Sequence, residues 1–459
     1  MAKYEKYTEY QDSGVEWLGE IPSHWQASYV GVLSDVIDPQ PDHRAPAISE
    51  DGEGFPYIGI RDVNKDGTLN FETARPVEES AVLKQERSFT IEPHNIIFCK
   101  VGTLGLPRKI IPHGRCALSA TLVLIKARKI NSQFLLYALD SDCIISQTNF
   151  LATGSTRAAL GIQQIRKFRI PFPPLLDQLA IANFLDHETA QIDTLIAKQE
   201  KLIELLKEKR QAVISHAVTK GLNSDVTMKD SGVEWLGQVP EHWKVSKLKW
   251  KAVTTSGSTP TTSKYELYYE NGDIPWIRTT DLNNSDLYET PIYITSRAVN
   301  DTACSVLPIN SILIAMYGGA GSIGKHSLLK FESTINQAVC GVLPSKVYDP
   351  DYLHRFYEFY RPFWMIGASG TRKDPNIGQD HIKEAFVPIP PLDEQRQIAQ
   401  YISEIQTKFD ALTKKAESAI QLMQERRTAL ISFAVTGKID VRNWQVPHKN
   451  NKANTEKVA

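Results

Sequence analysis

The chain has 459 residues, 42% of them hydrophobic, and a formal net charge of −1, which predicts two to four domains with apolar cores. No apolar run approaches the ~18 residues that a membrane span needs, and the polar start MAKYEKYTEY predicts no secretory signal. The five cysteines are scattered and never spaced as Cys-x-x-Cys, which argues against a disulfide framework or a zinc knuckle and indicates a reducing cytoplasm.

The first element along the chain is a tryptophan-containing motif, which we call the Trp motif and which occurs twice. DSGVEWLGEIPSHW at Asp12–Trp25 recurs as DSGVEWLGQVPEHW at Asp230–Trp243, with eleven of fourteen positions identical. The sequence between the copies diverges, so the motif should serve a task that both copies share. We interpret it as packing that seats each copy against a helix. A repeated docking surface for a partner is the alternative.

Charge is distributed unevenly over the region that follows the first motif. Residues 35–92 carry 13 acidic and 6 basic side chains, whereas residues 93–176 carry 11 basic side chains and only two acidic ones. This asymmetry is typical of a phosphate-binding face. The alternative is that the cations are spread around the surface and neutralised by the acidic stretch before them.

Both copies contain predicted strands, rich in β-branched and apolar residues, at HNIIFCKV, ALSATLVLIKA, SILIAMYG and NQAVCGVL. A glycine-rich turn follows a strand in each copy, at Val101–Lys109 and Tyr317–Lys325, and a small polar and basic cluster comes later, at Ala152–Arg157 and Ala368–Lys373. Such turns offer backbone N–H groups and a cation to phosphate, and Arg, Ser and Thr also read base edges. For each cluster alone, a polar loop with a structural Arg is the alternative.

A long helix is predicted after a Pro-Pro bend in each copy, because proline cannot lie inside a helix and acidic residues follow at once. Gly221 and Gly437 lie where each helix should stop. The 42 residues of 177–218 would make a rod of about 63 Å.

The two helices carry the apolar spacing of a coiled coil. Steps of four and three residues from Ile181 meet seven apolar side chains in eleven positions, and the same register from Ile398 meets ten when alanine is counted. This pattern predicts a seam of four to five heptads, so each helix needs a partner.

The bend and the helix recur at an offset of 217 residues, since RIPFPPLLDQLAIANFL at 169–185 aligns with FVPIPPLDEQRQIAQYI at 386–402. With the Trp motif, this indicates a duplicated unit that covers residues 1–227 and 228–445. Two similar units tend to pair about a pseudo-twofold axis, which would make the helices antiparallel. The alternative is that each helix packs only on its own domain.

Motifs for catalysis are missing from the sequence. We find no Asn-Pro-Pro-Tyr-like methyltransferase loop, no S-adenosylmethionine fingerprint, no His-Glu-x-x-His and no paired-carboxylate nuclease cluster. GAGSIGK at 319–325 nearly spells a Walker A loop, but His326 follows where a Ser or Thr should hold magnesium. A P-loop-like phosphate-handling enzyme that uses this loop is therefore kept only as an alternative.

The two Trp motifs, the two Pro-Pro-Leu bends and the Gly-Ser-Thr-Arg-type clusters together resemble the specificity subunit of type I restriction–modification systems. The resemblance covers residues 4–445, and the first copy departs from it at Leu179, where the second has Arg396. It implies two target-recognition domains that each read one half of a split double-stranded DNA sequence, with the helices setting the gap. It further implies a non-catalytic chain that docks methyltransferase subunits, two by our expectation, and restriction subunits, with S-adenosylmethionine, ATP and Mg²⁺ on those partners.

The expected fold is therefore mixed α+β, with two similar recognition domains separated by two long antiparallel coiled-coil helices in a pseudo-twofold arrangement. The expected boundaries are 1–170 and 228–387 for the recognition domains, 171–227 and 388–445 for the helices, and 446–459 for a disordered tail. We expect no metal site and no membrane association. A coiled-coil scaffold without a DNA role is the second alternative. The DNA contacts that we predict are Lys100, Arg108, Lys109, Thr156, Arg157, Lys325, Thr371, Arg372 and Lys373.

Overall fold

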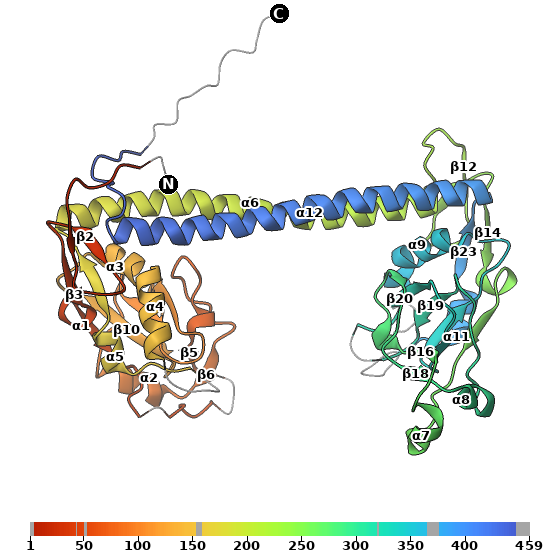
Figure 1. Ribbon diagram of the computed structural model, residues 1–459, viewed down its shortest axis with the longest axis horizontal. Coiled ribbons are helices and arrows are strands. Elements are labelled where there is room, and N and C mark those ends of the chain that lie inside the picture. Colours follow the sequence, from red (N-terminus) through yellow and green to blue (C-terminus); the bar gives the residue numbers. More distant parts are fainter. Residues whose placement is uncertain are drawn as a thin grey trace, which may run out of the picture. The chain divides into compact units, whose positions relative to one another are not determined.

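The fold is taken from a computed structural model that describes residues 4–42, 44–49, 53–152, 158–318, 321–364 and 376–446. The chain divides into two compact units, which we call the first unit (Met1–Gln199 with Glu417–Ala459) and the second unit (Glu200–Ala416). Each unit combines sheets and short helices with parts of two long helices, so the predicted mixed α+β class is confirmed (Figure 1). Apart from Val446, the predicted disordered tail lies outside the described residues.

Two sheets form the centre of the first unit. A four-stranded antiparallel sheet has the order β4–β10–β7–β8, and a three-stranded sheet has the order β6–β5–β9, in which β5 and β9 run parallel. Their bounds are β4 Ser34–Ile37, β5 Phe55–Ile58, β6 Arg75–Val77, β7 Ile96–Cys99, β8 Gly105–Lys109, β9 Ala117–Leu118 and β10 Leu122–Ala127.

Short helices and two-stranded ribbons complete the first unit. The ribbons pair β1 with β2 and β3 with β11, so the strand before the long helix returns to the end of the Trp motif. The bounds are β1 Tyr10–Asp12, β2 Glu20–Pro22, β3 Gln26–Tyr29, β11 Arg169–Phe172, α1 Val30–Leu33, α2 Glu79–Glu86, α3 Ser132–Leu139, α4 Asp142–Leu151 and α5 Ile162–Arg166.

The second unit repeats this topology. Its larger sheet has the order β15–β22–β19–β20 with β17 added at the edge, and its smaller sheet has the order β18–β16–β21. The bounds are β12 Met228–Asp230, β13 Gln238–Pro240, β14 Lys244–Lys247, β15 Thr254–Ser256, β16 Ile274–Ile277, β17 Asp286–Leu287, β18 Tyr293–Ile294, β19 Ile312–Ala315, β20 His326–Leu329, β21 Thr334–Ile335, β22 Val339–Val342, β23 Phe386–Ile389, α7 Tyr265–Tyr268, α8 Ser296–Asp301, α9 Pro350–Tyr360 and α11 Gln379–Glu384. The duplication read from the sequence is therefore also a duplication of the strand order.

The four predicted strands are present, with one difference. ALSATLVLIKA forms two strands, β9 and β10, which belong to different sheets. The chain turns between them at 119–121, where the Ser119 hydroxyl accepts a hydrogen bond from the backbone N–H of Thr121 at 3.3 Å. A hydroxyl that bonds to nearby backbone offers an alternative to a strand ladder, which the apolar pattern did not reveal.

The two long helices begin and end where the sequence predicts. α6 covers Leu175–Lys220 and α12 covers Leu392–Val435, and both start directly after a Pro-Pro pair. Gly221 and Gly437 follow their ends with φ of 79° and 72°, the left-handed conformation that closes many helices.

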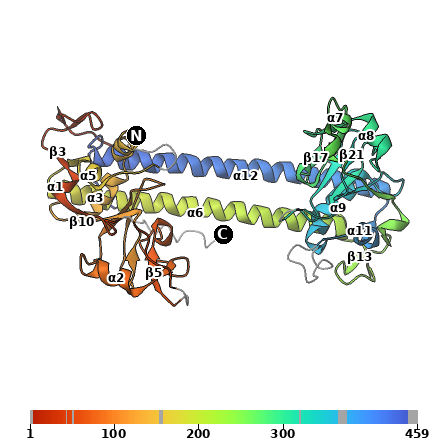
Figure 2. The ribbon, with the colours of Figure 1, turned by 90° about the horizontal axis from the view of Figure 1, so that it is seen from below.

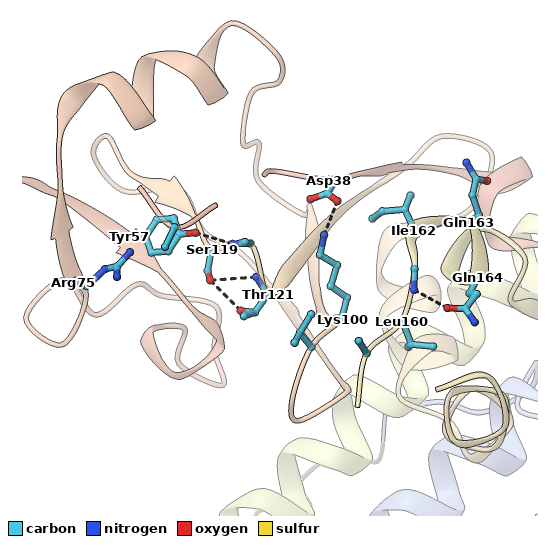
Figure 3. A pocket seen from close by; sticks show the side chains of 15 residues that line it. Asp38, Tyr57, Arg75, Lys100, Ser119, Thr121, Leu160, Ile162, Gln163 and Gln164 are labelled. Atoms are coloured by element: carbon cyan, nitrogen blue, oxygen red, sulfur yellow. Dashed lines mark hydrogen bonds and ion pairs between the residues drawn. The ribbon is translucent and has the colours of Figure 1, made fainter. Parts of the chain in front are cut away.

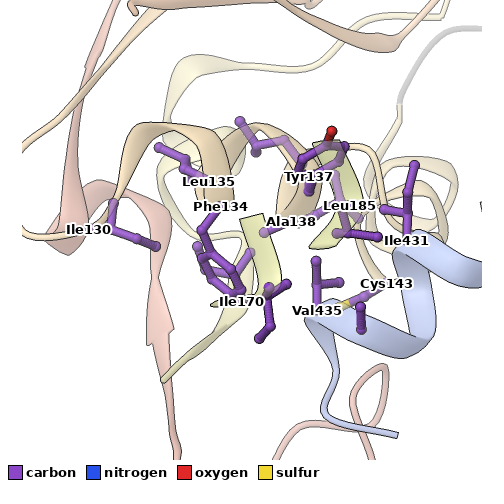
Figure 4. Packing of buried hydrophobic residues seen from close by; sticks show 14 of the residues in the cluster. Ile130, Phe134, Leu135, Tyr137, Ala138, Cys143, Ile170, Leu185, Ile431 and Val435 are labelled. Carbon is purple, nitrogen blue, oxygen red and sulfur yellow. The ribbon is translucent and has the colours of Figure 1, made fainter. Parts of the chain in front are cut away.

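The helices pack in opposite directions within each unit. In the first unit, the start of α6 and the end of α12 share one apolar core, to which Leu185 and Ile431 belong (Figures 1, 2 and 4). In the second unit, the end of α6 and the start of α12 share another apolar core, to which Ile214 and Ile402 belong. The antiparallel pairing is therefore confirmed inside each unit, and the helices also bury side chains of the adjoining sheets and short helices.

The predicted apolar seam is partly wrong. Leu195, Leu202 and Leu412 lie on it but are 48%, 42% and 47% exposed, whereas Ile196 and Ile214 are buried instead. A straight helix with 3.6 residues per turn drifts by about 20° per heptad from a strict seven-residue repeat. The buried stripe therefore moves off the predicted positions along each helix.

The Trp motif packs against the first turn of a long helix in each unit. The indole of Trp25 is fully buried and donates to the carboxylate of Asp177 at 2.9 Å, while Nε2 of His24 lies 2.9 Å from the same oxygen. In the second unit, Trp243 is equally buried, and His242 lies 2.8 Å from Glu394. The packing interpretation of the motif is therefore confirmed.

Replacing Gly437 with alanine should destabilise the first unit by about 2–3 kcal/mol. A Cβ at this position would lie 2.5 Å from Cγ of Pro22 and 3.0 Å from Cζ3 of Trp25, in a left-handed backbone that also strains any side chain. Gly14 is a matched control, because its φ is 66° and a Cβ there would meet nothing within 4 Å. Gly14→Ala should cost only about 1 kcal/mol of strain. Urea denaturation measures both, and equal losses would mean that the contact with Pro22 is unimportant.

Candidate nucleic-acid interface

A cavity of about 1060 Å³ opens in the first unit between its two sheets and the segment that leads into α5. In Figure 3, Arg75 and Tyr57 lie on one side of an ion pair between Lys100 and Asp38, and the segment from Leu160 to Gln164 lies on the other. The hydroxyl groups of the turn at 119–121 also line it. The cavity therefore collects side chains from parts of the sequence that are far apart.

Lys100, the first predicted DNA contact, lies in this cavity but does not offer a free cation. Its side chain is 2% exposed, and its ammonium donates to the carboxylate of Asp38 at 2.5 Å. The Asp38 side chain is 15% exposed. The paired ammonium holds the carboxylate of Asp38 in place, and Asp38 is the more exposed of the two side chains. A DNA group that reached this site would therefore meet Asp38 at least as readily as Lys100.

The second unit has different residues at the equivalent positions. The backbone N–H of Lys100 donates to the carbonyl of Thr121 at 2.8 Å, and that of Met316 donates to Ala338 at 2.8 Å, so Met316 takes the place of Lys100. By the register of β15 on β22, Ser256 takes the place of Asp38. The two units thus share a fold, while the chemistry at this point changes from an ion pair to a thioether and a hydroxyl.

Arg75 and Tyr57 face each other across the ladder of β5 and β6. The guanidinium carbon lies 5.0 Å from the centroid of the tyrosine ring, and the tyrosine hydroxyl accepts a hydrogen bond from the backbone N–H of Ala120 at 2.8 Å. The ring is therefore fixed at both ends. Arg75 stacks on it as a planar group that lines the cavity.

The glycine-rich turn of the first unit meets the residues that follow its polar cluster beside this cavity. The backbone N–H of Gly102 donates to the carbonyl of Ala158, and that of Leu160 donates to the carbonyl of Lys100. Ile377 repeats the second contact on Met316 at 2.9 Å. The residues that flank the predicted clusters therefore lie next to the turns that follow β7 and β19, although the two elements are more than 50 residues apart in the sequence.

The other described candidates of the first unit lie on β8. The guanidinium of Arg108 donates to the carbonyl of Val63, which ties the strand to the loop after β5, and Lys109 is half-buried beside it. Thr156 and Arg157 lie outside the described residues, as do Thr371, Arg372 and Lys373 of the second unit. The assignment of all these residues to DNA stays a prediction.

Lys325 lies in the hairpin between the antiparallel strands β19 and β20. A Walker A loop leads into a helix, whereas this turn leads into strand β20, so the P-loop alternative is not supported. Burial lowers the pKa of the neighbouring His326 to about 4, and the carbonyl of Gly324 partly opposes this shift. The imidazole next to Lys325 is therefore neutral near pH 7.

Sequence reasoning missed Asp38, Tyr57 and Arg75, although one signal was available. FPYIGIRD at 55–62 and IPWIRTTD at 274–281 share their Pro, Ile and Asp, and in each the Asp accepts a backbone N–H three residues earlier at 2.8 Å. This third duplicated motif places Tyr57 and Trp276 at equivalent points of the smaller sheets. Arg75 carried no such signal, because Ile292 lies opposite Trp276 in the second unit.

The described residues contain no group of three or more His, Cys, Asp or Glu side chains that could hold a metal ion. No helix among them is long and apolar enough to cross a membrane. None of the five cysteines forms a disulfide bond.

Known proteins resemble the chain over most of its length. It is 23% identical to the EcoBI type I restriction enzyme specificity subunit of Escherichia coli, over 86% of this chain and 81% of that protein. It is also 23% identical to the putative MjaX type I restriction enzyme specificity subunit of Methanocaldococcus jannaschii, over 93% and 96%. The fold is also similar to that of a solved structure described as the structural basis of complex assembly and conformational transition of the type I R-M system. The TM-score is 0.67 at 15% sequence identity, and the match covers 90% of this chain and 98% of that one.

A family model for the type I restriction modification DNA specificity domain matches residues 33–205 and 240–422. The two matches cover more than half of the chain, and they fall on the two copies of one strand order that the structure shows. The chain therefore belongs to the family of type I restriction–modification DNA specificity proteins.

Proposed function

We propose that this chain gives a type I restriction–modification enzyme its DNA specificity, and that each unit reads one part of a split double-stranded sequence. One observation carries the proposal. The two units share one strand order but differ in side chains at equivalent points, such as the ion pair of Lys100 and Asp38 against Met316 and Ser256. A duplicated frame with divergent lining is what two readers of different sequences require, since base edges are told apart by donors and acceptors.

The chain acts as a non-catalytic subunit in this proposal. Its sequence carries no motif for S-adenosylmethionine, ATP or Mg²⁺, so we assign these cofactors to partner subunits that methylate and cut DNA in the cytoplasm. Two methyltransferase subunits are proposed, one for each unit. Each of the long helices α6 and α12 belongs in part to both units, and we assign to them the task of setting the gap between the two halves of the DNA site.

The test is to assemble the chain with its modification subunits, expose DNA to the complex and map the methylated adenines. One split motif with a constant gap is the expected result. The mass of the complex in solution should match one copy of the chain with two modification subunits. A complex that assembles but methylates without sequence preference, or leaves no footprint on DNA, would instead support the scaffold alternative.

A further inference from the structure

We propose that the cavity of the first unit that Arg75, Tyr57 and Lys100 line receives the edge of a guanine from the DNA target, and that Arg75 reads it. The proposal rests on the proposed function and adds a specificity-determining residue to it. A neighbouring cavity of about 450 Å³ shares five lining residues with the larger one, so the two form a continuous hollow. The shared residues are Tyr57, Arg75, Val101, Ser119 and Thr121.

Arg75 has hydrogen-bond donors without acceptors at the wall of this hollow. Its Nε and Nη2 are shielded from solvent and have no hydrogen-bond partner among the described residues. Arg115 and Arg278 are satisfied, the first by Glu79 and Glu86 and the second by both oxygens of Asp281. Among the described residues, Arg169 also has a shielded Nε without a partner, over the ring of Tyr29, but it lies outside the hollow. The side chain of Arg75 as a whole is half-buried and lines the hollow, so a turn of the guanidinium toward the hollow brings its unpaired donors to an acceptor that enters from outside.

The chemistry of the hollow favours a base over a backbone phosphate. Two further cations line it, and each has a carboxylate beside it: Lys100 is paired with Asp38, and Arg61 is followed by Asp62, which also lines the hollow. Tyr57 holds the guanidinium as a flat fork, and this shape matches the two adjacent acceptors O6 and N7 of guanine. Adenine has a donor amino group in place of O6, so an N–H of the guanidinium would face an N–H of the base.

The second unit cannot make the same contact. Ile292 lies opposite Trp276 where Arg75 lies opposite Tyr57, and Met316 stands in place of Lys100. The indole N–H of Trp276 donates to the carbonyl of Ser258 at 3.0 Å, so this ring is also fixed, but without a guanidinium across the ladder. A change at Arg75 should therefore alter only the half-site that the first unit reads.

The experiment compares Arg75→Lys and Arg75→Ala with the unchanged chain, each assembled with the modification subunits, by mapping methylated adenines. Both variants should lose discrimination at one G·C pair of one half-site by roughly 5- to 150-fold, the range for one bidentate contact, while the other half-site keeps its sequence. Lysine keeps the charge but lacks the planar fork, so it should not restore the guanine preference. If Arg75→Ala fails to fold, Arg75→Lys still tests the loss of guanine preference.

Arg115→Ala is the matched control, because Arg115 lies in the same unit, pairs with surface carboxylates and does not line the hollow. It should leave the methylated motif unchanged. An unchanged motif in the Arg75 variants overturns the proposal, as does an even loss of methylation at every site, which would mark a phosphate contact. A split motif from the unchanged chain supports the proposed function in either case, so the two failures can be told apart.

Discussion

Replacing Trp25 with alanine is expected to lower the free energy of unfolding of the first unit by about 3–5 kcal/mol, the usual cost of deleting a buried tryptophan. The side chain is fully buried between the first turn of α6 and Tyr7, whose ring centroid lies 5.4 Å away. The change would also leave the buried carboxylate of Asp177 without the hydrogen bond that the indole donates to it. Chemical denaturation of the full chain measures the loss.

The duplication supplies a sharper comparison for this prediction. Among the described residues, the buried indole nitrogen of Trp243 has no hydrogen-bond partner, whereas that of Trp25 donates to Asp177. Phenylalanine keeps most of the ring but removes the N–H, so Trp25→Phe should cost about 1.5–3 kcal/mol and Trp243→Phe should be close to neutral. Trp250, which is 70% exposed, is the surface control, and its replacement with alanine should change stability by less than about 0.5 kcal/mol. Equal losses for the two phenylalanine variants would contradict a role for the bond to Asp177.

Replacing Lys100 with alanine is expected to cost about 3–5 kcal/mol, because it leaves the partly buried carboxylate of Asp38 without its cation. In the second unit, the uncharged side chains of Met316 and Ser256 take the positions of Lys100 and Asp38 in the same strand order. The double variant Lys100→Met and Asp38→Ser should therefore recover most of the lost stability.

Thermal or urea unfolding of the two variants checks this prediction. Lys84 is the matched control: it also pairs with an aspartate, Asp42, but both side chains are largely exposed. Lys84→Ala should change stability by no more than about 1 kcal/mol. If the double variant were as unstable as Lys100→Ala, the loss would come from packing of the lysine stem and not from the unpaired charge.

The elements that the sequence predicted well depend on local signals. Pro-Pro pairs and the glycines at 221 and 437 fix the ends of α6 and α12, because proline cannot enter a helix interior and glycine accepts the left-handed stop. Apolar runs predicted β7, β10, β19 and β22, since central strands bury both faces. The repeat then extended each prediction from one unit to the other.

The candidate site was harder to predict because it depends on pairs that are distant in sequence. Asp38 meets Lys100 across 62 residues and Arg75 meets Tyr57 across a strand pairing, and neither spacing follows a local period. The basic character of 93–176 indicated the right region, but it could not show that the ammonium of Lys100 would be neutralised within the same unit. The seam was partly wrong for a different reason, since a straight helix drifts from a strict seven-residue repeat and the buried stripe moves off the predicted positions.

The first unit takes its last core residues from the end of the chain, and this has a consequence for synthesis. Leu430, Ile431 and Val435 complete its core, and the backbone N–H of Asp440 donates to the carbonyl of Glu5 at 2.8 Å. At typical ribosome speeds, the amino-terminal half waits on the order of ten seconds or more while the second unit is made. During that interval the core side chains of Ile181 and Leu185 lack these partners, so the nascent chain should need chaperone protection, and a premature stop just after Ala416 should remove part of the first unit's core while the second unit stays complete.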